Sequence, residues 1–204
     1  MRIATEDDIK FVPQILDEIE VSAKERGTGI AKRTPSYVED KIREGKTIIA
    51  FSDKGEWAGF CYIETWSNKE YVANSGLIVA RKFRKDGLAK KIKERTFQHS
   101  REKFPEAKIF GLTTGLAVMK INSDLGYRPV TYSELTQDEV FWKGCQSCVN
   151  FEILKSKDRK NCLCTGMLYD PKWEKEKQID IKEEVSEQKF FSKFKKIKKL
   201  LWKK

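Results

Sequence analysis

The sequence predicts an α/β (α+β) domain, in which helices pack against a β-sheet. Residues 76–80 have the apolar, β-branched content of a buried strand, and the apolar spacing becomes helical after Gly87. Two more apolar runs, 47–51 and 57–66, flank a turn at 53–55 and predict an antiparallel hairpin. These observations place a helix directly after one strand of the expected sheet.

Composition limits the class of protein. The chain has 204 residues, which is enough for one domain with a sizeable core. Its net charge is +10, but residues 172–204 contribute twelve Lys and six acidic residues, so residues 1–171 carry only +4. This mild charge gives no reason to expect nucleic acid as a partner. No apolar run has the length of a membrane span and none follows Met1, so we expect a soluble cytoplasmic chain.

The first elements are a short strand at 1–4 and a long helix. Thr5 and Asp8 have the spacing of a capping box at a helix start. The apolar residues that follow recur at helical spacing and are Ile9, Val12, Ile15, Leu16, Ile19 and Ala23. Because Pro13 falls inside this pattern, we expect the helix to kink or break there.

The middle of the chain continues the alternation of strands and helices. A second helix is expected at 36–43, strands at 69–80, 108–114 and 127–130, and a short helix at 115–125. In the helix that follows Gly87, the residues expected on the side facing the core are Leu88, Ala89, Ile92, Thr96, His99, Ser100 and Phe104. We therefore expect His99 to be a packed residue.

The loop at 84–89 lies at the N-terminus of that helix. The first N–H groups of a helix lack intrahelical partners and carry the positive end of its dipole. Gly87 lets the chain approach a ligand closely, so the loop predicts a seat for a pyrophosphate. The alternative is a strand, turn and helix that bind no phosphate.

This hexapeptide, Arg-x-x-Gly-x-Ala, resembles the coenzyme A loop of the GNAT superfamily of N-acetyltransferases. Residues 77–79 resemble the splayed central strand of that family, 125–127 its Leu-Gly-Phe helix end, and 2–8 its first strand and helix start. The resemblance covers about residues 1–130. It implies a mixed, mostly antiparallel central sheet flanked by helices.

The resemblance also implies acetyl-CoA as co-substrate. The backbone of Leu77, Ile78 and Val79 would pair with the pantetheine arm. The pyrophosphate would lie on the loop and first helical turn, which contain Arg84, Lys85, Asp86, Gly87, Leu88, Ala89 and Lys90.

The general acid is where the sequence departs from the family pattern. The family often has a tyrosine four residues before the closing glycine, where it protonates the departing thiolate, but this chain has Asn122. An asparagine can hydrogen-bond the coenzyme but is no proton donor of suitable pKa. Tyr127 or Tyr132 is then the candidate acid, unless coenzyme A leaves unprotonated.

Glu64 is the candidate general base. It lies between aromatic residues on the 57–66 strand, where the pKa of a carboxylate rises when it is buried. The alternative is a glutamate on the solvent face of the strand.

The basic loop at 26–35 is the candidate acceptor site. In the family, the link between the first two helices commonly lines this site, so Arg26, Lys32 and Arg33 are candidates for holding a carboxylate substrate. A solvated basic loop is the alternative. Residues 27–35 and 143–150 resemble a bacterial subgroup associated with arginine biosynthesis, which implies glutamate or a related amino acid as acceptor.

Four cysteines form two close pairs, Cys145 with Cys148 and Cys162 with Cys164, separated by 13 residues. This spacing is compatible with a structural four-thiolate zinc site, while free thiols and disulfides remain alternatives. Strands at 149–154 and 162–169 would make a cysteine-containing hairpin within an extension at 144–171. Cys61 stands apart and is expected to be a packing residue.

The C-terminal region, 172–204, is expected to be a charged linker followed by a basic tail. Residues 189–204 carry eight lysines and no acid, with apolar residues at helical spacing. Such a helix fits the surface of an anionic membrane. A disordered tail, or packing against the second subunit of a homodimer, are the alternatives.

Two function classes follow. The first is an N-acetyltransferase that acts on the amine of a small molecule. The second is a catalytically weak binding or regulatory protein with the same fold and a structural zinc site, which Asn122 leaves open.

Overall fold

The computed structural model describes residues 1–27, 31–174 and 176, and of Arg26 only the backbone. The chain divides into two compact units, Met1–Tyr169 and Asp170–Lys204. In the second unit, the Asp170 carboxylate accepts a hydrogen bond of 2.9 Å from the Lys172 N–H. The predicted basic tail, 189–204, lies outside the described residues. The β-sheet and the helices that pack on it belong to the first unit.

One mixed sheet organises the first unit, and its strands run in the order β1-β2-β3-β4-β5-β7-β6. All neighbouring strands are antiparallel except β4 and β5. The predicted mixed, mostly antiparallel sheet is therefore confirmed. The strands described are β1 (Arg2–Ile3), β2 (Thr47–Phe51), β3 (Trp57–Trp66), β4 (Tyr71–Val79), β5 (Lys108–Thr113), β6 (Arg128–Val130) and β7 (Thr165–Tyr169).

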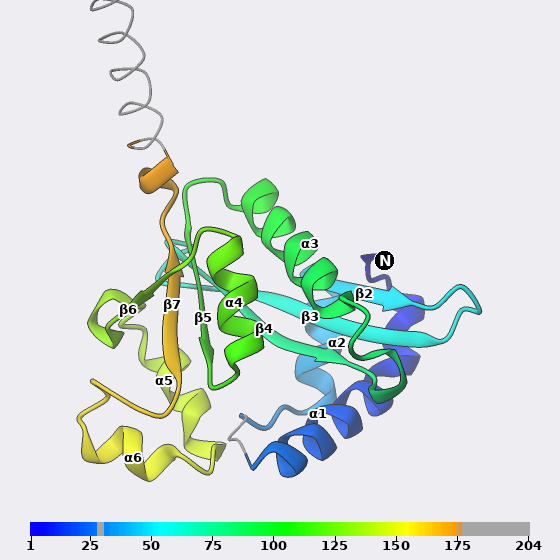
Figure 1. Ribbon diagram of the computed structural model, residues 1–204, viewed down its shortest axis with the longest axis horizontal. Helices are drawn as coiled ribbons and strands as arrows, with labels where there is room; N and C mark the ends of the chain where they lie inside the picture. Colours follow the sequence, from blue (N-terminus) through cyan, green and yellow to red (C-terminus); the bar gives the residue numbers. More distant parts are fainter. Residues whose placement is uncertain (28–30, 175, 177–204) are drawn as a thin grey trace, which may run out of the picture. The chain divides into compact units, whose positions relative to one another are not determined.

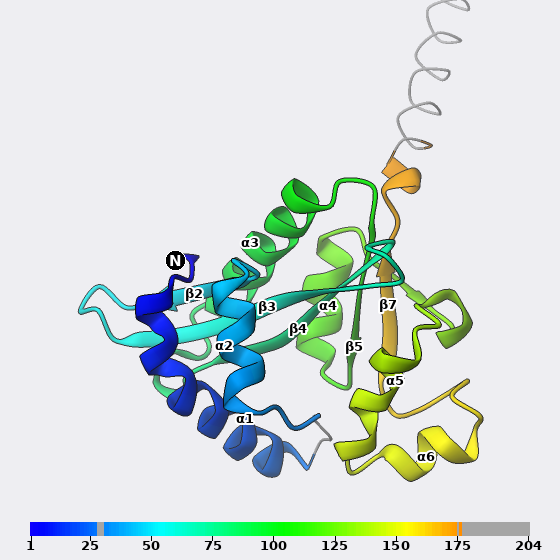
Figure 2. The same cartoon turned by 180° about the vertical axis from the view of Figure 1, so that it is seen from behind.

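Helices cover both faces of the sheet. Figure 1 shows α3 (Leu88–Lys103) and α4 (Leu116–Asp124) in front of it, and Figure 2 shows α1 (Val12–Arg26) and α2 (Pro35–Arg43) on the other side. The remaining helices are short and are η1 (Glu6–Phe11), η2 (Arg81–Phe83), η3 (Tyr132–Glu134), α5 (Glu139–Lys143), η4 (Gly144–Ser147) and α6 (Phe151–Ser156). Among the described residues, none of these helices has the length and apolar character needed to cross a membrane.

The N-terminal helix begins as its sequence predicts. The Thr5 and Asp8 capping box is present, and the buried Asp8 carboxylate also accepts two hydrogen bonds, of 2.6 and 2.9 Å, from the Arg2 guanidinium. The expected break also occurs, because a 3₁₀ helix ends at Phe11 and α1 starts at Val12. Pro13 then lies in the first turn of α1, where its missing N–H leaves no hydrogen bond unmade.

Each face of the sheet has its own apolar core. Side chains alternate along a strand, so neighbours on β3 such as Phe60 and Cys61 face opposite helices. The core under α1 and α2 includes Ile15, Val38, Ile49, Phe60, Tyr62 and Ile78. The core under α3 includes Ile48, Ala50, Cys61, Val79 and Ile92. The expectation that His99 is packed is also met, since it is buried and its Nε2 lies 2.8 Å from the Gly45 carbonyl oxygen.

The sheet opens between β4 and β5. Their pairing runs only from Tyr71 and Lys108 to Ala73 and Phe110. The rest of β4, from Asn74 onward, therefore has no neighbouring strand on that edge among the described residues. The two strands diverge from this point in Figures 1 and 2. Backbone groups on the open edge of β4 are therefore available to a ligand.

The predicted cysteine-containing hairpin is wrong. Residues 151–156 form helix α6, and β7 pairs with β5 and β6 instead of with a strand at 149–154. In this segment Leu154 is buried while Val149 is exposed, so the apolar residues do not line one face of a strand. A short apolar run fits helix and strand alike, and periodicity did not distinguish them.

Gly59 on β3 is expected to be intolerant of substitution. A Cβ at this position would lie 2.5 Å from Ile92 Cδ1 and 2.9 Å from the Ile78 carbonyl oxygen, so α3 and the backbone of β4 would have to move. Gly59→Ala should lower the free energy of unfolding by about 1–3 kcal/mol in chemical denaturation. Gly144→Ala is the control, because a Cβ at Gly144 meets nothing within 4 Å. Equal stability of the two variants would contradict this close packing.

Candidate functional site

The loop before α3 presents an open helix N-terminus. Gly87 is the N-cap with φ of 74°, and no side chain caps α3. Lys85 also has a positive φ, 77°, which is uncommon for a residue other than glycine. Lys85, Asp86 and Gly87 are exposed, and a Cβ at Gly87 would meet nothing within 4 Å. Free N–H groups, a positive dipole end and open space fit a phosphate group.

Arg84, the first residue of the loop motif, points into the protein. Its Nε donates to the Val79 carbonyl at 3.0 Å, and its terminal nitrogen lies 2.5 Å from Glu18 Oε1 and 2.5 Å from Ser22 Oγ. These contacts fasten the loop to α1 and to the end of β4. The Arg84 guanidinium thus positions the loop, and the backbone of Lys85, Gly87 and the first turn of α3 remains for a ligand.

The end of β4 carries a bulge. Phe60 and Tyr62 on β3 pair with Ile78 and Ser75, so β4 has one extra residue between those partners. Gly76 takes the positive φ of 66° that the bulge requires, and the Tyr62 ring fills the space where a Cβ would be. The predicted coenzyme strand, Leu77, Ile78 and Val79, follows the bulge on the open edge of β4.

Glu64 lies in a polar cluster on the α2 side of the sheet. Its side chain is 13% exposed, so it is not the solvent-facing glutamate of the alternative interpretation. Lys41 Nζ is 2.7 Å from one carboxylate oxygen, and the Tyr37 hydroxyl donates to the other. Burial raises the pKa of Glu64 to about 7, and the nearby positive charge of Arg33 opposes that rise.

Lys41 is itself mostly buried. Burial lowers the pKa of its ammonium, and Glu44 at the end of α2 acts in the opposite direction. The ion pair between Lys41 and Glu64 favours the charged form of both groups, so it works against both shifts. Glu64 can accept a proton from a substrate once it gives up its contact with Lys41 or Tyr37.

The basic loop between α1 and α2 reaches this cluster. Arg33 Nε donates to the Tyr62 hydroxyl at 2.5 Å and another Arg33 nitrogen donates to the Ala31 carbonyl, which uses two of its five N–H donors. Lys32 is exposed, and its backbone N–H donates to Ser147 Oγ at 2.9 Å. The side chain of Arg26 lies outside the described part of the chain.

The two candidate tyrosine acids are buried. The Tyr127 hydroxyl donates to Asn74 Oδ1 at 3.0 Å, and burial raises its pKa well above 10. The Tyr132 hydroxyl donates to the Cys164 carbonyl at 2.7 Å, and burial raises its pKa too. Asn122 is also buried, and its Oδ1 has no hydrogen-bond partner among the described residues. Each hydroxyl proton is thus held by an acceptor of the protein itself.

Sequence reasoning missed Tyr37, Lys41 and Lys93. Lys41 shares the buried stripe of α2 with Val38 and Ile42, and Tyr37 precedes it by one turn. Lys93 is buried on α3 next to Ile92. In each helix, a lysine on the apolar side was the available signal, since an unpaired lysine is rarely buried.

The four predicted metal ligands do meet. Cys145, Cys148, Cys162 and Cys164 all line one cavity of about 30 Å³ beside Tyr132 and Trp142. However, no group of three or more His, Cys, Asp or Glu side chains among the described residues is arranged to hold a metal ion, so the zinc site has no support. All four are free cysteines. Burial and the neighbouring sulfurs raise the pKa of Cys145 to about 11 and of Cys164 to about 12.

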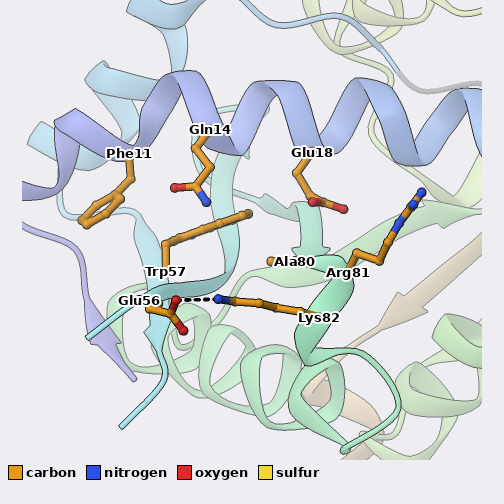
Figure 3. A pocket seen from close by; sticks show the side chains of 8 residues that line it. All are labelled: Phe11, Gln14, Glu18, Glu56, Trp57, Ala80, Arg81 and Lys82. Atoms are coloured by element: carbon orange, nitrogen blue, oxygen red, sulfur yellow. Dashed lines mark hydrogen bonds and ion pairs between the residues drawn. The ribbon is translucent and has the colours of Figure 1, made fainter. Parts of the chain in front are cut away.

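A second cavity, of about 500 Å³, lies beside α1 (Figure 3). Its lining residues are Phe11, Gln14, Glu18, Glu56, Trp57, Ala80, Arg81 and Lys82. Its charged groups already have partners, since Lys82 Nζ is 2.6 Å from Glu56 Oε1 and Glu18 holds Arg84, while Arg81 pairs with Glu25. We therefore assign no ligand to it.

The bulged β4, its separation from β5 and the open N-terminus of α3 define the GNAT fold, and comparison with solved structures supports this. The chain superposes on Rv2747 from Mycobacterium tuberculosis, solved with CoA, with a TM-score of 0.60 and 17% identity over 83% of this chain and 97% of the other. A GNAT-family acetyltransferase from Staphylococcus aureus gives a TM-score of 0.52 and 14% identity over 64% and 86%.

A third match is N-acetylglutamate synthase from Neisseria gonorrhoeae, solved with coenzyme A and N-acetyl-glutamate. Its TM-score is 0.58 at 18% identity, covering 83% of this chain. The chain spans about a third of that enzyme's length, 34%. No protein-family model and no curated protein matches the sequence. The likeness therefore establishes the fold.

Glu64 should titrate near neutral pH. Carboxyl ¹³C NMR, assigned with Glu64→Gln, should give a midpoint near 7, and Lys41→Met should raise it further because the carboxylate loses its ammonium partner. Lys54→Met, in the β2–β3 turn, should leave it unchanged. Since the native pKa exceeds the unfolded value, near 4.5, the Glu64 proton stabilises the fold at low pH, and this contribution is lost as pH rises to about 7. A midpoint near 4.5 would contradict this environment.

Proposed function

We propose that this protein is an acetyl-CoA-dependent N-acetyltransferase that acts on a small amine carrying a carboxylate. The observation that carries the proposal is the continuous path from the open edge of β4 to the uncapped N-terminus of α3. This path offers strand-like hydrogen bonds followed by an anion seat, which suits a pantetheine arm followed by a pyrophosphate. The activity would reside in residues 1–171.

Different residues would carry out different steps of the proposed reaction. N–H groups of Lys85 to Lys90 bind the pyrophosphate, and the Arg84 contacts hold this loop in place. The backbone of Leu77 to Val79 orients the acyl donor, so that an N–H beside the bulge can polarise the thioester carbonyl. Acetyl-CoA supplies the activated acyl group. Glu64, whose pKa lies near 7, removes the proton of the attacking amine.

The acceptor would carry a carboxylate that Arg33 and Lys32 bind. Arg33 keeps N–H donors beyond those used by Tyr62 and Ala31, and guanidinium pairs well with carboxylate. Two of the matched structures support an amino acid such as glutamate, since the Neisseria gonorrhoeae enzyme was solved with N-acetyl-glutamate and, separately, with L-arginine.

Gly87→Glu tests the pyrophosphate seat. The added carboxylate should repel the ligand and raise the KM for acetyl-CoA at least a hundredfold. In thermal denaturation, wild-type protein should gain about 2.7 kcal/mol of stability when coenzyme A is present at a hundred times its Kd. Gly55→Glu is the matched control, because Gly55 has a similar φ, 77°, and equally open surroundings in the β2–β3 turn. A folded Gly87→Glu variant with unchanged acetyl-CoA affinity would exclude this loop from the site.

Arg33→Met tests the acceptor. In a screen that follows free thiol release, the variant should show a KM at least tenfold higher for amino acids with a side-chain carboxylate, because one charged hydrogen bond is worth about 1.5–3 kcal/mol. Amines without a carboxylate should be unaffected. Arg43→Met, which removes a surface arginine of α2, is the control. If Arg33→Met leaves every acceptor KM unchanged, the basic loop does not bind substrate.

A further inference from the structure

A buried lysine with no counter-ion among the described residues lies beneath the opening in the sheet. Lys93 on α3 is 2% exposed, and its Nζ stands 5.3 Å from the centre of the Tyr127 ring. Among the described residues no carboxylate forms an ion pair with it, and none perturbs its pKa. A buried and uncompensated ammonium destabilises a fold, so such a group points to a function.

Contacts around Lys93 place it at the point where β4 and β5 separate. The Tyr127 ring lies next to the Lys93 ammonium, and the Tyr127 hydroxyl donates a hydrogen bond to Asn74. Asn74 is the first residue of β4 beyond its pairing with β5. The other neighbour that affects Lys93 electrostatically is Cys61 on β3. Lys93 thus lies on the inner side of α3, one and a half turns beyond the residues that begin the helix.

Asn122 is an unsatisfied polar group in the same layer. Asn122 on α4 is buried and its Oδ1 has no partner among the described residues, while its carbonyl oxygen accepts from the Tyr127 N–H at 3.0 Å. The ion pair between Lys90 and Asp124, at 3.2 Å, joins α3 to α4. The Asn122 side-chain oxygen is thus a buried acceptor that a donor on a ligand would satisfy.

The chemistry of Lys93 suits proton donation to sulfur. Burial lowers the pKa of its ammonium to about 8, close to the value of about 8.5 for a free thiol. A donor and an acceptor of similar pKa exchange a proton efficiently near neutral pH. Asn122, which replaces the tyrosine expected at its position, has no such proton.

We infer that Lys93 is the general acid of the proposed reaction, donating its proton to the sulfur that leaves the thioester. As the C–N bond forms and the C–S bond breaks, the electron pair passes to sulfur, which takes a proton from the Lys93 ammonium. The neutral lysine amine then recovers a proton from solvent, and the proton of the acceptor amine leaves through Glu64. This inference rests on the proposed acetyltransferase function.

The test uses full-length wild type, Lys93→Met and Lys93→Arg. Wild-type kcat should fall above about pH 8 as the ammonium loses its proton, and Lys93→Met should lower kcat about a hundredfold and abolish that limb. Lys93→Arg keeps the charge but cannot donate, so it should not rescue kcat. The Kd for coenzyme A should change less than threefold in Lys93→Met. Lys54→Met should behave as wild type.

Two readouts do not depend on turnover. NMR of isotope-labelled lysine should show one wild-type side chain titrating near pH 8, and this signal should be absent in Lys93→Met. The Tm of Lys93→Met at pH 7 should also rise, because a buried charge is removed, whereas loss of a merely structural contact would lower it.

The outcomes separate the two proposals. A wild-type lysine that titrates near 10.5, or a Lys93→Met variant with wild-type kcat and pH profile, overturns the role of Lys93 and leaves the acetyltransferase intact. Wild-type protein that fails to bind coenzyme A overturns both. If both variants fail to fold, a wild-type spectrum in which no lysine titrates near pH 8 still overturns the role of Lys93.

Discussion

The separation of β4 from β5 is the constraint on which the rest of the structure depends. Two parallel strands that share only three residue pairs leave one edge of β4 with unpaired backbone groups inside the domain. The bulge at Gly76 turns that edge, and the Tyr62 ring stabilises the bulge by packing where a side chain would otherwise be. A ligand in an extended conformation could pair with this edge as an added strand. Helix α3 follows β4 in the chain, so its N-terminus lies after the same strand.

Charge is arranged differently on the two sides of this opening. On the α2 side, Glu64 is held by Lys41 and Tyr37, so the carboxylate is buried together with compensating partners. On the α3 side, Lys93 has no such partner in the part of the chain that the structure describes. A proton acceptor with a raised pKa and a proton donor with a lowered pKa therefore lie on opposite faces of one sheet. The proposed acyl transfer would need one proton removed from the amine and one given to the leaving group, and this asymmetry would provide a group for each.

The fold itself was largely predictable from the sequence. The strand at 76–80 and the helix after Gly87 can be recognised from the spacing of apolar residues close together in the chain. Turn and capping signals, such as Thr5 with Asp8, also involve only neighbouring residues. The segment at 149–154 was not predictable in this way. Its few apolar residues fit either period, and in the folded chain it is β7 that pairs with β5 and β6 while residues 151–156 are helical.

By itself, the sequence determined the loop at 84–89, because an anion seat at a helix N-terminus is built from consecutive backbone groups. Only the tertiary structure decided what the side chains do. Arg84 belongs to the predicted phosphate motif yet points into the protein, and Tyr127 is buried with its proton engaged. Lys93 already lies on the apolar side of α3 in the sequence, but its burial without a carboxylate partner among the described residues follows only from the packing of α3 on the sheet. Burial, partners and pKa depend on residues far apart in the chain, and no local pattern specifies them.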